Sequence, residues 1–75
     1  MIAIKRGNQV NIEDGNTRLV VRQDGSGWMH EPNHEAYEVE MHEPVYLRAA
    51  KDAGLNISEA TISISRIRFE GYFAQ

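Results

Sequence analysis

The chain has 75 residues, one domain near the lower size limit for folding unaided, and it has no cysteine, which excludes disulfides and thiolate metal sites. Eight basic against eleven acidic residues give a net charge of −3, which argues against binding nucleic acid mainly through phosphate contacts. No apolar run is long enough for a signal peptide or a membrane span, so we expect a single cytoplasmic domain over residues 1–75 without membrane attachment.

The first third of the chain alternates apolar and polar residues in short runs that are separated by turn residues. This pattern predicts strands around residues 2–4, 10–12 and 17–22. The Asp14-Gly15 step is a strong hairpin signal, because both residue types tolerate the positive φ of a type I′ turn. We therefore expect consecutive antiparallel strands in this part of the chain.

The middle of the chain predicts further strand structure and then a helix. Residues 28–29 are expected to form a short strand or a core plug, and residues 37–41 alternate in the manner of a half-buried strand. Pro44 is suited to the first turn of a helix, and Gly54 is suited to its end. The apolar face of this helix is formed by Tyr46, Leu47, Ala50 and Ala53.

The last segment is ambiguous between strand and helix. Ile62 and Ile64, and then Ile67 and Phe69, alternate with polar residues, with a one-residue slip of the kind that a β-bulge produces. Wound as a helix, these residues would point to two opposite faces. The density of β-branched residues favours a strand, so we expect a strand over residues 60–69.

These elements together predict an α+β fold in the order β-β-β-β-α-β. The sheet is expected to contain about five short strands, mostly antiparallel, with the single helix packed on one face.

Three histidines form the only candidate metal site that the sequence offers. His30-Glu31-Pro32-Asn33-His34 matches the letters of the zinc-protease pattern H-E-x-x-H. That pattern needs a helix, and Pro32 lies between the two histidines. His42 would complete a ligand set only if the following strand folded back over the loop. We therefore assign no metal, no cofactor and no catalytic residue, and we expect the protein not to be an enzyme.

The most uneven feature of the sequence is a run of carboxylates between residues 31 and 43. The lysines and arginines all lie elsewhere, so an acidic surface here would suit a basic groove on a partner protein. The alternative is a solvated strand face with no binding role. The partner-binding residues that we expect are these carboxylates and two aromatic side chains near the C-terminus: Glu31, Glu35, Glu38, Glu40, Glu43, Tyr72 and Phe73.

From Tyr37 onward the chain resembles the ribbon–helix–helix repressors and antitoxins. The similarity covers a strand over 37–41, a helix over 43–53, the turn after it and Ser58-Glu59-Ala60 as the start of a second helix. The resemblance implies a homodimer in which outward residues of the strand contact bases in the major groove. Those positions hold Glu38 and Glu40 here, and phosphates repel carboxylates.

We therefore expect a non-enzymatic protein-interaction module, of the size of small phage- or plasmid-borne inhibitors and regulators, that binds a basic protein. A ribbon–helix–helix DNA-binding regulator or antitoxin over residues 37–73 is the alternative.

Overall fold

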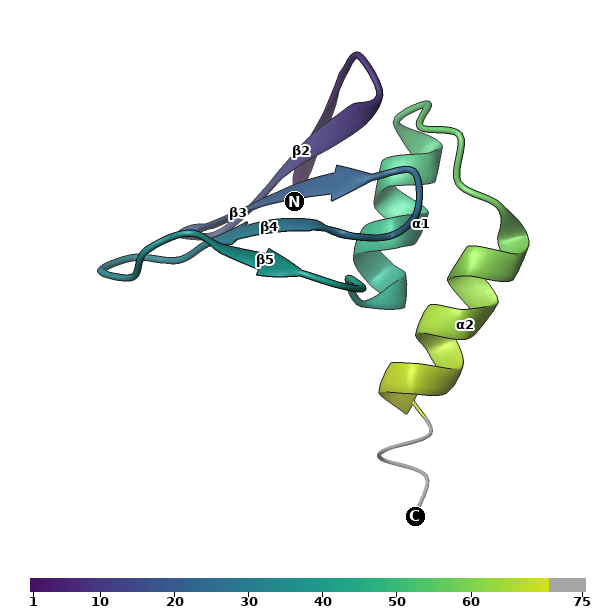
Figure 1. Cartoon of the computed structure of the whole chain (residues 1–75). Coiled ribbons are helices and arrows are strands. Elements are labelled where there is room, and N and C mark those ends of the chain that lie inside the picture. The colour runs from purple at the N-terminus through teal and green to yellow at the C-terminus, as the bar shows by residue number, and fades with distance from the viewer. Residues whose placement is uncertain (71–75) are drawn as a thin grey trace.

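The computed structural model describes residues 1–70 and contains five strands followed by two helices (Figure 1). The strands form one antiparallel sheet in which each strand pairs with the next along the chain. Their bounds are β1 (Ile2–Arg6), β2 (Gln9–Asp14), β3 (Thr17–Arg22), β4 (Gly27–His30) and β5 (Tyr37–Val39). The helices are α1 (Pro44–Asp52) and α2 (Glu59–Glu70). The expected α+β class and antiparallel sheet are confirmed.

The hairpin between β2 and β3 lies where the sequence places it, but its turn differs from the expected type. Asp14 pairs with Thr17 as the last residue pair of the ladder, so the turn consists of Gly15 and Asn16. In residues 1–70, Gly15 has a φ of 61°, whereas the only non-glycine residue with a positive φ is Asn33. A positive φ at the first turn residue alone is the pattern of type II′ rather than type I′.

The core lies between one face of the sheet and the two helices. Alternation places Val10 and Ile12 of β2 on the same face as Leu19 and Val21 of β3, and all four are fully buried. The helical side of the core consists of Leu47, Ala50, Leu55, Ile57 and Ile62. α1 contacts β1, β2 and β3, and α2 packs against α1. The opposite face of the sheet carries no helix from residues 1–70 and is called the open face below.

α1 follows the sequence expectation closely. Pro44 is its first residue, and Leu47 and Ala50 are buried against the sheet. Gly54 follows the helix with a φ of 109°, and its N–H donates a 2.9 Å hydrogen bond to the carbonyl of Lys51. A glycine tolerates this left-handed conformation, which explains why the helix ends here.

The strand expected over residues 60–69 is wrong, because this segment lies within α2. The Ser58 hydroxyl accepts a 3.1 Å hydrogen bond from the Thr61 N–H, which supports the first turn of the helix. α2 buries Ile62 and Ser65 and leaves Ile64 and Ile67 exposed. The observed order is therefore β-β-β-β-β-α-α, with two helices instead of one. Neither helix within residues 1–70 has the length and apolar character needed to cross a membrane.

Candidate functional site

The carboxylates of the expected binding segment lie along one outer edge of the sheet. β5 is the last strand of the sheet, and no strand of residues 1–70 pairs with its outer side. The carboxylates that flank or belong to β5 are named the acidic edge and comprise Glu31, Glu35, Glu38, Glu40 and Glu43. All of them are exposed except Glu31, which is half-buried. The unpaired side of β5 thus lies beside several negative charges.

Few of these carboxylates are neutralised by contacts within residues 1–70. The Tyr37 hydroxyl donates a 2.8 Å hydrogen bond to Glu31, and this bond raises the pKa of Tyr37 above its usual value. Arg68 of α2 lies 3.6 Å from Glu40, with both side chains largely exposed. Within residues 1–70, the carboxylates of Glu35, Glu38 and Glu43 make no ion pair and no side-chain hydrogen bond, so they remain available to a partner's cations.

The acidic edge does not form a single flat patch. Glu38 is the cross-strand neighbour of Trp28 and lies on the open face, whereas Tyr37 pairs with Met29, whose side chain packs against the core. Glu40 approaches α2 through Arg68. A partner that bound along β5 would therefore meet carboxylates on both sides of the sheet. Tyr72 and Phe73, the other two residues expected to contact a partner, lie outside the described residues.

The open face carries a row of aligned side chains, three of them apolar, that the sequence analysis missed. The ladder registers align Ile4, Asn11, Val20, Trp28 and Glu38 across all five strands. Ile4 is exposed, whereas Val20 and Trp28 are half-buried. The signal was present in Leu19-Val20-Val21, because alternation forces the middle residue of such a run to the face opposite its neighbours.

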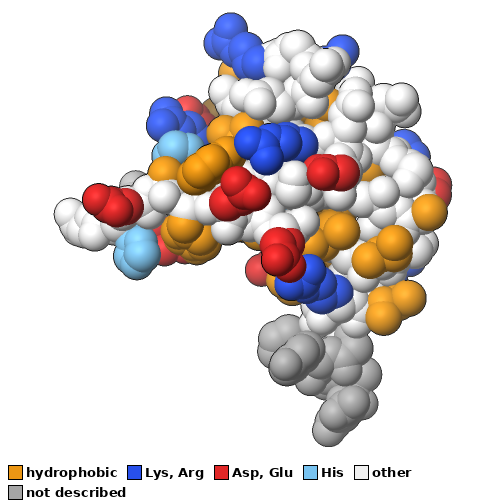
Figure 2. Space-filling view, in the orientation of Figure 1, with side chains coloured by type: hydrophobic (Ala, Val, Ile, Leu, Met, Phe, Trp, Pro, Cys, Tyr) orange, Lys and Arg blue, Asp and Glu red, His pale blue; other side chains and the backbone are white. Residues whose placement is uncertain are grey.

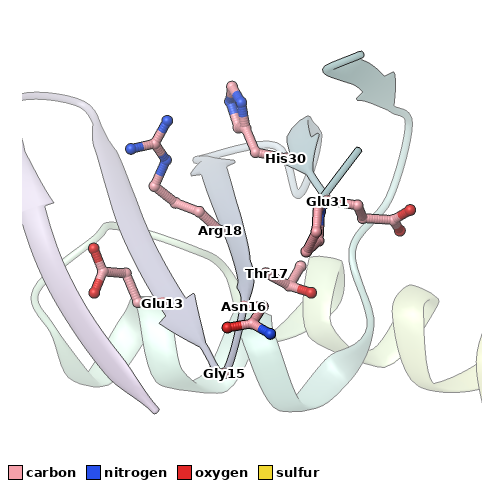
Figure 3. Close-up of a pocket in the computed structure, with 8 residues that line it drawn as sticks. Glu13, Gly15, Asn16, Thr17, Arg18, His30 and Glu31 are labelled. Atoms are coloured by element: carbon pink, nitrogen blue, oxygen red, sulfur yellow. The ribbon is translucent and has the colours of Figure 1, made fainter. Parts of the chain in front are cut away.

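A depression of the surface lies at the end of the sheet near the β2–β3 turn (Figure 3). It is shallow, has a volume of about 580 Å³ and is lined by Glu13, Arg18, His30 and Glu31 among others. Figure 3 shows Arg18 and His30 extending to the same side of the sheet, while Glu31 extends away from them. These charges are mixed in sign and do not converge on one point, so the depression resembles an ordinary polar surface.

The three histidines considered as metal ligands are not brought together. His30 ends β4, Asn33 has a φ of 60° and His34 lies in the loop before β5, so the H-E-x-x-H letters do not form a helix. His42 follows β5 in the sequence and is buried. Within residues 1–70, no group of three or more histidine and carboxylate side chains is arranged to hold a metal ion.

His42 instead belongs to the core, where it is 1% exposed. Its Nε2–H donates a 2.9 Å hydrogen bond to the carbonyl of Val20, which fixes the tautomer and leaves Nδ1 as an acceptor. Nδ1 has no hydrogen-bond partner in residues 1–70. Burial lowers the pKa of His42, and the bond to Val20 opposes this only in part, so the surroundings favour the neutral ring. It lines a small apolar cleft of about 150 Å³ together with Met41 and Phe69.

Charged side chains of both signs are interspersed over the visible face of the molecule, and hydrophobic side chains gather over α2 (Figure 2). The large hydrophobic residues of the helices that are exposed are Val45, Ile64 and Ile67. Comparison with known protein families, with curated proteins and with solved structures found no match to this chain.

Proposed function

We propose that this protein is a non-enzymatic protein-interaction module, comparable to small phage- or plasmid-borne inhibitors, that binds a basic segment of a partner along the acidic edge. One observation carries the proposal: exposed carboxylates lie beside the unpaired side of a strand. An extended partner segment can add to such an edge through main-chain hydrogen bonds.

Affinity and specificity would come from different groups in this mode of binding. The main-chain groups of β5 would pair with any extended segment, whereas Glu35 and Glu38 would select one that carries lysine or arginine. The carboxylates would also accelerate encounter with a basic partner, and added salt would reduce that acceleration. Salt-sensitive binding of a basic extended peptide is therefore the expected signature.

The proposal is tested with a short capped peptide in which lysine and valine alternate. Its binding is followed by fluorescence anisotropy at low and at high salt. We expect the double variant Glu38→Lys/Glu40→Lys to lose affinity for this peptide by about tenfold or more, because two attractive charges become repulsive. A capped serine–valine peptide serves as the neutral probe and is expected to bind weakly to both proteins.

The matched control is Glu13→Lys/Asp52→Lys, which changes the net charge equally at two exposed residues outside the acidic edge, one on β2, which two strands separate from β5, and one at the end of α1. This variant is expected to lose much less affinity than the edge variant. Equal losses in the two variants would show that net charge alone governs binding, and the proposed role of the acidic edge would then be wrong. Lysate proteins that bind the wild type and the control, but not the edge variant, are the candidate partners.

A second candidate function is DNA binding of the ribbon–helix–helix type. It is favoured by the strand–helix–helix order of β5, α1 and α2, in which α2 replaces the strand expected from the sequence. Two features favour the protein-binding proposal instead: β5 pairs with β4 of its own chain, and Glu38 occupies the outward position of that strand. A gel-shift titration with duplex DNA separates the two functions, since the protein-binding proposal expects no retarded complex.

A further inference from the structure

The second edge of the sheet differs from the acidic edge in chemistry. β1 forms this edge, and no strand of residues 1–70 pairs with its outer side. Ile2 is 58% exposed and Ile4 is 50% exposed, and both lie on the open face. No carboxylate occurs within β1, whose sequence is IAIKR. Natural proteins rarely leave an apolar edge strand of this kind uncovered, because it is a template for pairing with another strand.

The β1–β2 hairpin determines which backbone groups of β1 face outward. Arg6 and Gln9 close a two-residue turn, so they form a hydrogen-bonded pair in the ladder. Hydrogen-bonded pairs recur at every second position of an antiparallel ladder, which makes Ile4 and Ile2 the next two such residues of β1. The main-chain N–H and C=O groups of Ala3 and Lys5 therefore point away from β2, toward the unpaired side.

We propose that a second copy of this chain occupies this edge, with the two β1 strands antiparallel and Ala3 opposite Ala3 of the other copy. In this register the outward groups of Ala3 form a hydrogen-bonded pair across the two-fold axis. Ile2 then faces Ile4 of the second copy in a non-hydrogen-bonded pair. Side chains approach most closely in such pairs, so four exposed isoleucines cover one another.

The positions of the cations of β1 and of the open face are both compatible with this dimer. Lys5 and Arg6 end β1, so antiparallel pairing places the cations of the two copies at opposite ends of the ladder. A two-fold axis perpendicular to the sheet keeps α1 of both copies on the same side, and the two open faces become continuous. The acidic edges of the two copies then lie at the outer ends of the joined sheet, where both remain free.

β5, the other edge strand of a second copy, is a less suitable partner for β1. Pairing of β1 with β5 in a continuous sheet would place the isoleucines beside Glu38, since Glu38 ends the row of side chains that begins with Ile4. Such head-to-tail pairing would also leave one β1 and one β5 unpaired in any assembly that does not close into a ring. A β1–β1 dimer covers the apolar residues and closes.

The proposal is tested by the mass in solution, measured by light scattering over a hundredfold range of concentration. The wild-type chain has a mass of 8.5 kDa, and we expect twice that mass at the upper end of the range. Ile4→Lys is expected to be monomeric throughout, because each lysine would face an isoleucine of the other copy. Ile67→Lys, at a residue of α2 that is 75% exposed, is the matched control and is expected to remain dimeric.

A backbone variant separates strand pairing from general hydrophobic contact. Ala3→Pro removes an outward N–H without removing a hydrogen bond of the β1–β2 ladder, so it should abolish the dimer while circular dichroism retains the monomer's spectrum. A monomeric wild type would overturn the proposal. So would a dimer that is lost in Ile67→Lys but kept in Ile4→Lys, or a mass that keeps rising with concentration beyond that of a dimer.

The register is tested with single cysteines, which the chain otherwise lacks. Under mild oxidation, Ile2→Cys and Ile4→Cys are each expected to stay uncrosslinked alone but to form a mixed disulfide when combined, because their Cα atoms would lie within disulfide range. Efficient crosslinking of Ile4→Cys alone would overturn the Ala3-centred register. None of these outcomes depends on peptide binding at the acidic edge.

Discussion

The Ser65 hydroxyl donates a 2.7 Å hydrogen bond to the main-chain carbonyl of His42, and both residues are buried. This bond joins α2 to the segment between β5 and α1. Ser65 and His42 are 23 positions apart in the sequence. It is a polar contact inside an otherwise apolar interface, where a lost partner leaves a buried carbonyl unsatisfied.

We therefore expect Ser65→Ala to lower the free energy of unfolding by about 1–2 kcal/mol, measured by urea denaturation. Ser63→Ala is the control, because Ser63 lies on the same helix but is exposed. Alanine raises helix propensity equally in both variants, so their difference isolates the buried bond. If the two variants were equally stable, the Ser65 bond would contribute nothing.

Ser65 also shows why the last segment could not be assigned from the sequence. A helix over these residues needs Ile62, Ser65 and Phe69 on its inner face, and a serine at the centre of that face conceals the helical period. Ile64 and Ile67 lie on the outer side, where they are 57% and 75% exposed. Together with Ile62 and Phe69 they form the apolar alternation that favoured a strand, although neither of them belongs to the core. The Ser58 cap was the local signal for a helix.

The strands and α1 were predictable because each has a local cause. Turn glycines separate the first strands, and Pro44 and Gly54 bound the helix. The location of the carboxylates at a sheet edge was not predictable, because it depends on the order of the strands. The burial of His42 could not be predicted for a similar reason, because its hydrogen-bond partner is the Val20 carbonyl, on a strand remote in sequence.

The loop side of the helix pair contains a charged cluster centred on Glu59. Its carboxylate accepts hydrogen bonds from Arg48, at 2.9 and 3.1 Å, and from Lys51 at 2.7 Å, which lowers the pKa of Glu59 to about 2. The contribution of Glu59 to stability is thus present above its ordinary pKa and is lost as the pH falls toward 2. Glu59→Gln should lower the melting temperature slightly at low salt. The difference should shrink at high salt, since these groups are exposed.

At Gly27, β4 lies against the Val20 carbonyl of β3 and the ring of His42. A Cβ atom at this position would overlap the Val20 carbonyl oxygen and would lie 2.8 Å from His42 Nε2. We expect Gly27→Ala to unfold the protein or to lower its melting temperature steeply, because backbone atoms cannot move aside. Asn16→Ala is the control, since Asn16 is an exposed turn residue without a positive φ, and it should leave the melting temperature nearly unchanged. A stable Gly27→Ala variant would contradict the close approach of β4 to Val20.

The last prediction concerns the pH dependence that His42 confers on folding. Burial holds the pKa of His42 below its ordinary value of 6.5, whereas in the unfolded chain the ring titrates near 6.5. As the pH falls below 6.5, the unfolded chain takes up a proton that the folded chain does not. Stability is therefore complete above pH 6.5 and declines below it, by at most about 1.4 kcal/mol per pH unit, until the folded pKa is reached.

Urea denaturation at pH 7.5 and pH 5.5 measures this decline. His34→Gln removes an exposed histidine and should leave the decline unchanged, whereas His42→Gln should flatten it. If His42→Gln is too unstable to compare, NMR titration of the ring protons in the wild type gives the folded pKa directly. A His42 ring that titrates at or above 6.5 in the folded protein would refute the prediction, because burial would then not disfavour its charged form.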